Sequence, residues 1–327
     1  MPRRILTPSG HGDETIAIAH DLIPPEFELI QAPHGRPEFW DILKDVEFYI
    51  GAGQYKHGPE FYAQAPKLKL VQTLSAGYNT YDLDAARAAG VPICNNGGAN
   101  ATAVAEHAIM LMLAVSRNLI SVHDGVVSGR WRGNDFNSTK LYELEDKVLG
   151  IVGLGNIGTK VARRAKAFDM RVQYYDINRL TTAQEDSLGI RFALFPEILK
   201  TSDYVSLHCP LMPETKHIMN AKTFAMMKPG SYIVNTGRGP LIDEAALAAA
   251  LDKGQLAGAA LDVVEKEPPT DSPILGRDNV IITPHTAFYS EEALLDLQAK
   301  AAEEVVRVLS GQAPKNPVNP EALKAAG

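Results

Sequence analysis

The stretch Val148-Leu149-Gly150-Ile151-Val152-Gly153-Leu154-Gly155-Asn156-Ile157-Gly158 decides the fold of this chain, because an apolar run stops abruptly at three glycines spaced G-x-G-x-x-G. The pattern predicts a strand, a tight turn and a helix. Gly153 would let the chain turn, Gly155 would let a pyrophosphate approach the backbone, and Gly158 would let the helix pack closely on the strand. Free N–H groups at the helix start, at Asn156 and Ile157, would then face the phosphates. Glycine triplets also occur in ordinary strand-to-helix turns, so the motif needs support from its surroundings.

That support comes from a second predicted strand, residues 171–175, which ends at Asp176. An acid at this distance from the glycines is expected to hold the adenosine ribose hydroxyls of a dinucleotide. A carboxylate there also repels a 2′-phosphate, so the sequence predicts NAD(H), with NADP(H) less favoured. Arg179, three residues further on, could accept that phosphate and keeps the second cofactor open. The alternative is that Asp176 merely opens a turn.

The composition is that of an ordinary globular protein. A chain of 327 residues predicts two domains, with 45% apolar and 22% charged residues. A net charge of −7 gives no reason to expect nucleic acid or anionic membrane as a partner. The start of the chain lacks the apolar region of a secretory signal, and the apolar run 109–115 is too short to span a bilayer. The two cysteines, Cys94 and Cys209, are expected to be buried thiols of a cytoplasmic protein.

The first hundred residues predict a parallel sheet with helices on its faces. Short apolar runs at residues 4–6, 27–30, 48–50, 68–72 and 91–94 alternate with potential helices. Two loops follow predicted strands, residues 51–54 with Ala52 and residues 75–79 with Ser75, Ala76 and Gly77. Loops at the carboxyl ends of parallel strands bind ligands in such sheets. Simple connecting turns are the alternative.

In the second half, each predicted strand ends in polar residues. The strands at 203–207, 231–234, 258–261 and 280–283 run, in that order, into His208-Cys209-Pro210, Asn235-Thr236-Gly237-Arg238-Gly239, Asp262 and Pro284-His285. If these strands are parallel, their polar residues meet at the edge that carries the glycine turn. Arg238 and His285 are therefore expected to converge.

Three helices are predicted, one before these strands, one between them and one after them. Residues 103–116 are apolar nearly all round, which predicts a helix buried between domains or against a second subunit. Within it, Glu106 and His107 are expected to form a buried pair and not a metal site; no metal is expected. Residues 244–251 form an alanine-rich helix, and residues 291–309 a helix that returns to the first domain.

Two segments have no predicted strand or helix. Residues 125–133, with Trp131, predict an extended arm that contacts a second copy of the chain. The tail, residues 311–327, is expected to be poorly packed at its end.

The site residues fit hydride transfer. A carbinol C–H releases a hydride only if the hydroxyl proton leaves in step, so the site needs an acid/base and a substrate anchor. His285 is the best acid/base candidate, because Pro284 holds the chain extended before it; His208 is the main rival. Arg238, which has glycines on both sides, has room to bind a carboxylate through two parallel hydrogen bonds. Glu267 would pair with His285 and keep it protonated for reduction of a keto group.

These residues resemble the D-isomer-specific 2-hydroxyacid dehydrogenases over nearly the whole chain. The matching segments are 100–107 (NATAVAEH), 153–158 (GLGNIG), 227–230 (MKPG), 235–239 (NTGRG), 260–263 (ALDV) with Glu267-Pro268, and 283–285 (TPH). The resemblance implies that Arg238, Glu267 and His285 are catalytic. It also implies cofactor contacts for residues that all lie near the carboxyl ends of the later strands: His208, Cys209, Pro210, Thr215, Thr236, Gly237 and Asp262. Ala76 and Gly77 would bind the substrate carboxylate, near Ala52 and Ser75.

The fold that the resemblance implies is α/β, with two doubly wound parallel-sheet domains and a cleft between them. A Rossmann NAD-binding domain would span residues 101–289. A flavodoxin-like substrate domain would combine residues 1–100 and 290–327. The protein would act on a small 2-oxo or 2-hydroxy acid and form a homodimer.

Departures from the family pattern narrow the expected substrate. The length of the chain and the absence of an arginine from residues 51–54 disfavour phosphoglycerate, and Glu267 disfavours formate. Residues 285–289 are similar to the D-lactate branch, whereas the rest is closer to glyoxylate and hydroxypyruvate reductases. Tyr55, Phe288 and Trp131 would line an apolar pocket for an unphosphorylated 2-oxo acid. Two alternatives stay open: a dinucleotide-sensing corepressor with little turnover, and a protein that binds another nucleotide.

Overall fold

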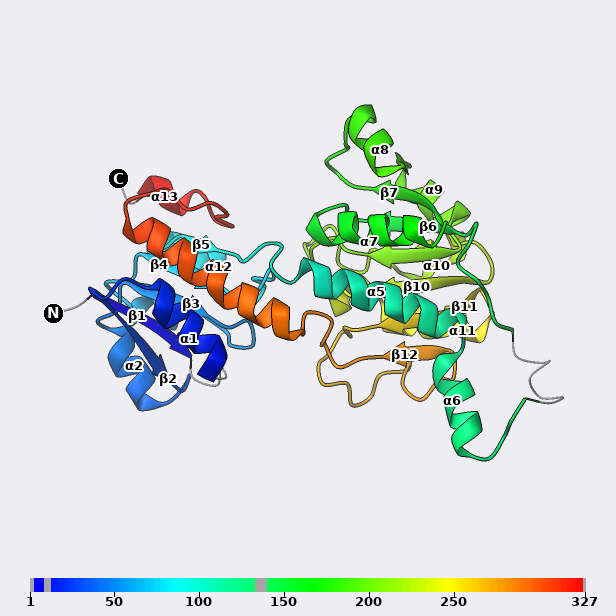
Figure 1. The fold of residues 1–327 in the computed structure, drawn as a ribbon, viewed down its shortest axis with the longest axis horizontal. Helices are drawn as coiled ribbons and strands as arrows, with labels where there is room; N and C mark the ends of the chain where they lie inside the picture. The colour runs from blue at the N-terminus through cyan, green and yellow to red at the C-terminus, as the bar shows by residue number, and fades with distance from the viewer. Residues whose placement is uncertain (1–2, 9–12, 133–139, 326–327) are drawn as a thin grey trace. The chain divides into compact units, whose positions relative to one another are not determined.

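The computed structural model describes residues 3–8, 13–132 and 140–325 of the chain. The chain divides into two compact units, one of Met1–Asn100 with Tyr289–Gly327 and the other of Ala101–Phe288. Each unit contains one fully parallel sheet (Figure 1). The predicted fold class, two doubly wound α/β domains, is confirmed. The second crossing between the units precedes Tyr289, one residue before the predicted boundary.

The first unit is built on a five-stranded sheet in the order β2-β1-β3-β4-β5, which is the flavodoxin-like order. Every strand coincides with one of the apolar runs. The strands are β1 (Arg3–Pro8), β2 (Phe27–Ala32), β3 (Phe48–Gly51), β4 (Leu70–Thr73) and β5 (Ile93–Cys94).

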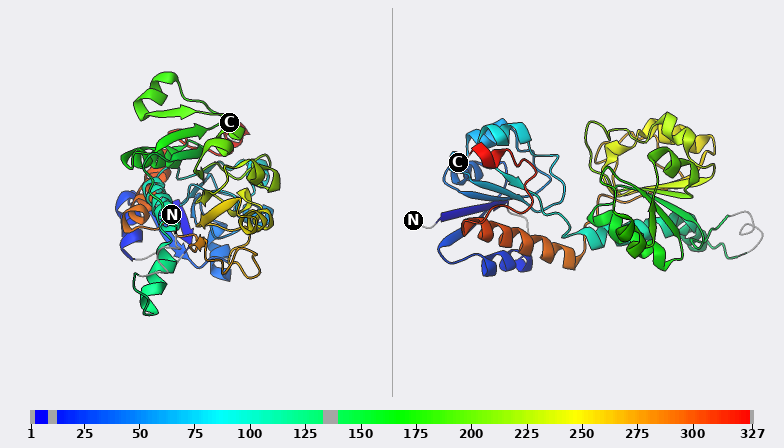
Figure 2. Two further views of the ribbon diagram at one scale, coloured as in Figure 1. Left: turned by 90° about the vertical axis from the view of Figure 1, so that its right-hand side faces the viewer. Right: turned by 90° about the horizontal axis from the view of Figure 1, so that it is seen from above.

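Helices cover both faces of this sheet, as Figure 2 shows. Alternate residues of β3 point to opposite faces, so that Phe48 and Ile50 pack in one core cluster and Tyr49 in the other. The last long helix packs on α1, which confirms that the chain returns to the first domain. The helices are α1 (Asp13–Leu22), α2 (Pro37–Leu43), α3 (Pro59–Ala63), α4 (Leu83–Ala88), α12 (Glu291–Leu309) and α13 (Ala322–Ala325).

The tail after α12 is attached to the sheet of its unit. Asn319 is fully buried, its side-chain oxygen accepts the Ile93 N–H at 2.7 Å, and its amide donates to Val91 O at 3.1 Å. These bonds attach the tail to β5 as far as Asn319, whereas the expectation of poor packing concerned the end of the tail. Residues 326–327 lie outside the described residues.

The second unit is built on a seven-stranded sheet in the order β12-β11-β10-β9-β6-β7-β8. Its first six strands in chain order reproduce the 3-2-1-4-5-6 order of the Rossmann fold, and β6, which precedes the glycine turn, lies beside the middle strand, β9. Strand β8 has no counterpart in the sequence prediction. The strands are β6 (Val148–Val152), β7 (Arg171–Tyr175), β8 (Ile190–Phe192), β9 (Tyr204–Leu207), β10 (Ser231–Asn235), β11 (Leu256–Leu261) and β12 (Val280–Ile282).

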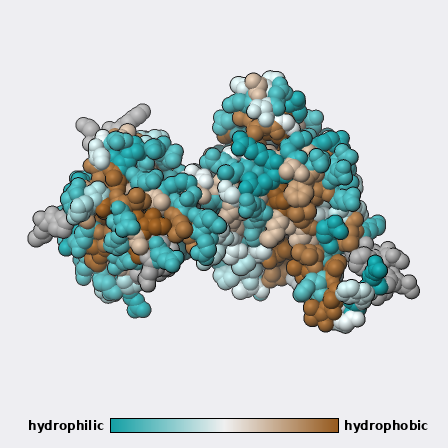
Figure 3. Space-filling model, viewed as in Figure 1, coloured by the Kyte–Doolittle hydropathy of each residue, from teal (hydrophilic) through white to brown (hydrophobic). Residues whose placement is uncertain are grey.

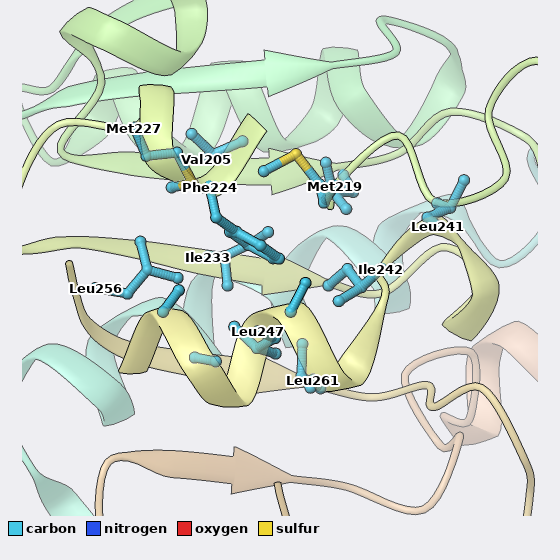
Figure 4. Close-up of a cluster of buried hydrophobic side chains, with 14 of the residues drawn as sticks. Val205, Met219, Phe224, Met227, Ile233, Leu241, Ile242, Leu247, Leu256 and Leu261 are labelled. Atoms are coloured by element: carbon cyan, nitrogen blue, oxygen red, sulfur yellow. The ribbon is translucent and has the colours of Figure 1, made fainter. Parts of the chain in front are cut away.

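Two core clusters pack on the two faces of this sheet. One holds Ile233 of β10 against Phe224 and Leu247, and Figure 4 shows how these side chains interdigitate. The other holds Val234 against α5 and α7. The helices are α5 (Ala101–Ser116), α6 (Leu119–Val127), α7 (Asn156–Ala167), α8 (Thr182–Leu188), α9 (Phe195–Thr201), α10 (Ala221–Met226), the 3₁₀ helix η2 (Gly239–Leu241) and α11 (Glu244–Asp252).

Helix α5 is a core helix of its own unit. Ten of its sixteen residues are buried, and it packs on α7 and on β10, β11 and β12. The predicted burial of this helix is confirmed. The elements that cover it belong to its own unit, whereas the sequence predicted burial between the domains or against a second subunit. Among the described residues, no single helix has the length and composition to cross a membrane. The pair α5 and α6 would pass that test together, but it is bent by 61°.

The expected extended arm begins later than the sequence predicts. Gly125 and the two residues after it still belong to α6, which ends at Val127. Trp131 follows the helix and is strongly exposed. Gly133, the last residue of the expected arm, lies outside the described residues.

Candidate active site

The three glycines after β6 differ in their surroundings. Gly153 has a φ of +95°, and a Cβ there would lie 2.5 Å from Cys209 N, so the turn is compatible only with glycine. At Gly158 a Cβ would overlap Gly153 O, whereas at Gly155 it would have no neighbour within 4 Å. Gly155 is also the N-cap of α7 and makes no side-chain cap bond. The turn therefore leaves open backbone and uncapped N–H groups, Asn156 and Ile157 being the first helical residues, which fits a pyrophosphate.

Asp176 lies beside this turn. One carboxylate oxygen accepts the Leu154 N–H at 2.7 Å, and the other accepts the Asn178 N–H at 2.8 Å. The first bond connects the end of β7 to the glycine turn, so the acid is fixed beside that turn.

His208 follows β9 and is held by hydroxyl groups. Its Nε2 lies 2.8 Å from Ser206 Oγ, and its Nδ1 lies 3.5 Å from Thr236 Oγ1. Burial lowers the pKa of His208 to about 4. Both ring nitrogens of His208 are engaged by hydroxyl groups, which disfavours this rival of His285 as the proton donor in reduction.

The residues after His208 form a closed loop. Thr215 Oγ1 donates to Pro210 O at 2.7 Å and accepts the Met212 N–H at 2.8 Å. Cys209 is half-buried, where full burial was expected, and burial raises the pKa of its thiol to about 11. Both cysteines are free, and Cys94 is buried as predicted.

Arg238 is positioned by the loop after β10. The buried Asn235 side chain accepts the Gly237 N–H and donates to Arg238 O, both at 2.9 Å. The guanidinium donates to Gly237 O at 2.6 Å. Burial lowers the pKa of Arg238, and the nearby Glu267 carboxylate partly offsets that effect. Gly239 does not supply the expected room: a Cβ there would overlap Val264 O, so this glycine serves the close packing of two loops.

His285 and Glu267 are joined by a hydrogen bond. His285 Nδ1 lies 2.7 Å from Glu267 Oε2, and the two side chains are 42% and 39% exposed. His285 has a φ of +55°, a conformation that non-glycine residues rarely adopt. Burial raises the pKa of Glu267, but the hydrogen bond and charge of His285 outweigh burial, so the net shift is downward. The predicted pairing is therefore present in the structure, and the Phe288 ring lies edge-on 6.4 Å from the imidazole.

Asp262 holds the loop that carries His285. Its carboxylate accepts the Thr283 hydroxyl at 2.6 Å and the Thr286 and Ala287 N–H groups at 2.9 Å each. Its carbonyl accepts the His285 N–H at 2.8 Å. The carboxylate is buried, so these bonds explain how the unusual φ of His285 is maintained.

The expected buried pair of Glu106 and His107 is wrong. Glu106 is exposed and pairs with Arg164 at 2.7 Å, because adjacent residues of a helix point in different directions. His107 instead contacts Thr283 Oγ1 at 2.9 Å and lies 3.5 Å from Asp262 Oδ1. Sequence reasoning did not predict that His107, Thr283 and Asn235 hold the site residues in place. The only indication in the sequence was that each of them lies in a segment that resembles the family.

The first unit has two short loops at the carboxyl edge of its own sheet. Ser75 Oγ donates to Gly77 O at 2.6 Å, and Asn95 donates to Ala76 O at 2.9 Å. The carbonyl groups are thus engaged within the loop, and the described residues give the Ala76 and Gly77 N–H groups no acceptor. Ala52, in the other loop, is buried.

Aromatic side chains adjoin these loops. Tyr55 stacks on His34 with ring centroids 4.0 Å apart. Within the described ranges, no group of three or more His, Cys, Asp or Glu residues is arranged to hold a metal ion.

A Rossmann sheet with an open glycine turn near its centre, an acid after the next strand and a histidine–carboxylate pair at the same edge defines a dinucleotide-dependent oxidoreductase. The family within this class follows from comparison with known proteins. Residues 109–287 match the family described as D-isomer specific 2-hydroxyacid dehydrogenase, NAD binding domain. The chain belongs to this family, as its motifs predict.

Similar proteins extend the match beyond this domain. A glyoxylate reductase of Thermococcus litoralis is 34% identical over 307 residues, which are 92% of each chain. The D-mandelate dehydrogenase of Rhodotorula graminis has a TM-score of 0.87 at 29% identity, over 97% of this chain and 98% of that one. A D-lactate dehydrogenase of Aquifex aeolicus, complexed with NAD and lactic acid, has a TM-score of 0.81 at 27% identity over 98% of both chains. The protein is accordingly an NAD-dependent oxidoreductase that acts on a CH–OH group.

Proposed function

We propose that this protein transfers hydride reversibly between NAD(H) and C2 of a small, unphosphorylated 2-oxo or 2-hydroxy acid. The observation that carries the proposal is the pair of His285 and Glu267, joined at 2.7 Å at the edge of the sheet that also carries the glycine turn. A half-exposed, carboxylate-bound imidazole is suited to exchange a proton with a bound substrate.

The cofactor residues in this proposal are those at the carboxyl ends of β6, β7, β9, β10 and β11. The glycine turn and the start of α7 would bind the pyrophosphate, and Asp176 the adenosine ribose. The nicotinamide supplies or accepts the hydride. The remaining cofactor contacts are assigned to His208, Cys209, Pro210, Thr215, Thr236, Gly237, Arg238, Asp262 and His285.

In the direction of reduction, protonated His285 donates its Nε2 proton to the keto oxygen, and in oxidation it takes the hydroxyl proton back. Glu267 stabilises the imidazolium through Nδ1, which also directs Nε2 away from the carboxylate. Arg238 binds the substrate carboxylate, because a planar guanidinium forms two parallel hydrogen bonds with it.

The substrate class is supported by the chemistry of the first unit. Residues 51–54 contain no arginine or lysine, so this loop offers no charged partner for a phosphate. The Ala76 and Gly77 N–H groups are suited to a carboxylate, with Ala52 and Ser75 shaping the two loops. We assign Tyr55, Phe288 and Trp131 to the substrate side chain. The similar proteins act, by their names, on glyoxylate, mandelate and lactate.

The test is NADH oxidation against glyoxylate, hydroxypyruvate, pyruvate, phenylpyruvate and 2-oxoisocaproate, with 3-phosphohydroxypyruvate for comparison. We expect turnover of at least one plain 2-oxo acid and a much lower kcat/KM for the phosphorylated acid. Equal rates with both would contradict the substrate class. Binding of NADH without turnover of any acid would favour the dinucleotide-sensing alternative.

We also propose that the protein forms a homodimer through an apolar surface on and beside α5 and α6. Figure 3 shows apolar side chains over α6. Exposed large apolar side chains gather in this part of the chain, which is unusual for a monomer. They are Met110, Leu119, Ile120, Val126, Val127 and Trp131.

Sedimentation velocity of the wild type and of Val127→Glu tests the dimer. We expect a dimer for the wild type and mostly monomer for the variant, because a charge on a covered apolar surface is costly to bury. Leu275→Glu, at an exposed apolar residue outside this surface, is the control. A wild-type monomer at micromolar concentration would contradict the proposal.

A further inference from the structure

Arg179, which the sequence left open as an acceptor of a 2′-phosphate, has a different partner in the structure. Its Nε donates to Glu185 Oε1 at 3.2 Å, and its guanidinium carbon lies 4.7 Å from the centre of the Phe192 ring. The arginine side chain is 59% exposed, whereas that of Glu185 is only 4% exposed. A cation at the surface is thus bound to a carboxylate beneath it.

Glu185 is fixed independently of Arg179. The Tyr174 hydroxyl donates to the same carboxylate oxygen at 3.1 Å and accepts the Leu180 N–H at 2.9 Å. Glu185 lies on α8, whose first turn is fixed by the capping box of Thr181 and Gln184. The carboxylate is therefore held by β7, by α8 and by the loop between them, and it stays in place when the arginine side chain moves.

The charge balance of this pair bears on the choice of cofactor. Arg179 is the only cation in residues 176–181, the loop that starts at Asp176. An arginine near the ribose-binding acid is the usual partner of a 2′-phosphate. To serve one here, Arg179 would have to leave the buried Glu185 carboxylate without its cation, which is unfavourable.

We propose that Glu185 determines the specificity for NAD by holding Arg179 against Phe192, so that the cation of this loop is withheld from a 2′-phosphate. Asp176 repels the phosphate directly, and Glu185 removes its partner. The inference rests on the proposed function in one respect, the placement of the adenosine ribose at Asp176.

The experiment measures binding of adenosine 2′,5′-bisphosphate and of 5′-AMP by calorimetry. These ligands differ only in the 2′-phosphate, and neither takes part in hydride transfer. In an Asp176→Ala background, Glu185→Gln frees the charge of Arg179, and we expect the bisphosphate to bind at least about tenfold more tightly, as for a new charge-assisted bond. Binding of 5′-AMP should change less than about twofold, and adding Arg179→Gln should abolish the gain.

Asp186→Asn is the matched control, because Asp186 lies on the same helix and pairs with Arg191 at 2.9 Å at the exposed surface. It changes the charge equally and frees a different arginine, so no gain is expected. A gain from Asp186→Asn, a gain that survives Arg179→Gln, or no gain from Glu185→Gln would overturn the inference.

A second comparison does not depend on the folding of the Glu185 variant. With Glu185 present, Arg179→Gln in the Asp176→Ala background should change bisphosphate binding less than about twofold, because the arginine is already withheld. A loss of fivefold or more would show that Arg179 serves the phosphate and would overturn the inference. If Asp176→Ala itself changes the binding of neither ligand, the ribose placement fails and the inference fails with it. If only the Glu185 and Arg179 results fail, the proposed function stands.

Discussion

The two units share an architecture but differ in where they place titratable side chains. In the first unit, His57, Tyr49 and Tyr81 lie in the interior, and His57 is only 1% exposed. In the second unit, His285 and Glu267 lie half-exposed at the sheet edge, with His285 Nδ1 2.7 Å from Glu267 Oε2. In the proposed function these two parallel sheets serve separate tasks: the first provides shape through backbone groups, and the second provides the groups that exchange protons.

The interior cluster of the first unit keeps its histidine neutral. The His57 ring stacks on Tyr81 at 4.3 Å, and its Nε2 lies 3.0 Å from the Tyr49 hydroxyl. Burial lowers the pKa of His57 to about 3 and raises that of Tyr49. These groups are thereby removed from titration near neutral pH and serve packing.

The largest effect is expected for His285→Asn, which removes the proton donor at the edge of the second unit. Without a general acid, kcat should fall by about 10²-fold or more. Steady-state NADH oxidation measures the rate, and quenching of protein fluorescence measures NADH binding, which should weaken far less than kcat falls, because His285 is one of many assigned cofactor contacts. His123→Asn, at an exposed histidine of α6, is the control and should retain full activity. Full activity of His285→Asn would show that another residue is the acid/base, and the proposed difference in task between the two units would no longer rest on His285.

The next effect concerns the stability of the first unit at acid pH. Because the folded His57 titrates near pH 3 and an unfolded histidine near 6.5, the unfolded state binds more protons between these values. The contribution of the buried His57 to the free energy of unfolding is therefore fully present above about pH 6.5 and is lost as the pH falls. At pH 5 the loss is about 2 kcal/mol, or roughly 30-fold in the unfolding equilibrium.

Urea unfolding at pH 7.5 and pH 5, followed by the fluorescence of Trp40 in a Trp131→Phe background, measures this loss. His57→Gln should reduce the difference between the two pH values by about 2 kcal/mol. His20→Gln, at an exposed histidine of the same unit, should leave it unchanged. An equal pH dependence in wild type and His57→Gln would show that the buried histidine does not set acid stability.

Sequence patterns predicted the local features of both units, because these depend on neighbouring residues. Apolar runs located the strands of the first sheet, and the glycine spacing located the turn after β6. The position of His285 at the sheet edge was predictable from the strand that precedes it, whereas its pairing with Glu267 was predicted mainly through the family resemblance. Strand β8 was missed, because it has only three residues and so resembles part of a connecting loop in the sequence.

Contacts between distant residues were not predictable. His107 meets Thr283 across 176 positions, and Asn319 meets Ile93 across 226. Arg179 and Glu185 are near in sequence, but one lies in a loop and the other on the buried side of a helix, so no periodicity pairs them. In each case the partner depends on how elements pack, and local sequence does not encode it.

A smaller effect is expected for Glu267→Gln, which tests the proposed role of the second unit in proton exchange. The lowered pKa of Glu267 keeps its carboxylate charged throughout the working range, so its charge favours the protonated imidazole. Without that charge, the alkaline limb of kcat/KM for reduction should move to lower pH, so that the rate at a fixed pH on that limb falls. The acid limb of the oxidation reaction should move to lower pH as well, because oxidation needs the neutral ring.

Full pH–rate profiles in both directions measure these shifts. Glu265→Gln is the matched control, because Glu265 is two residues away and pairs instead with His217 at 2.5 Å. Its profiles should keep the wild-type limbs. A uniform loss of rate in Glu267→Gln, with both limbs in place, would show that Glu267 orients the ring without tuning its protonation.

The smallest effect is expected for Ser75→Ala in the first unit. The change removes the bond from Ser75 Oγ to Gly77 O and loosens the loop that presents the Ala76 and Gly77 N–H groups. One local hydrogen bond is worth about 1 kcal/mol, so KM should rise by roughly threefold to tenfold while kcat stays near the wild-type value. Ser310→Ala, which removes a similar bond at the end of α12, should change neither constant. A fall in kcat as large as that of His285→Asn would mean that the first unit also acts on the reacting atoms, and the division between shape and chemistry would no longer hold.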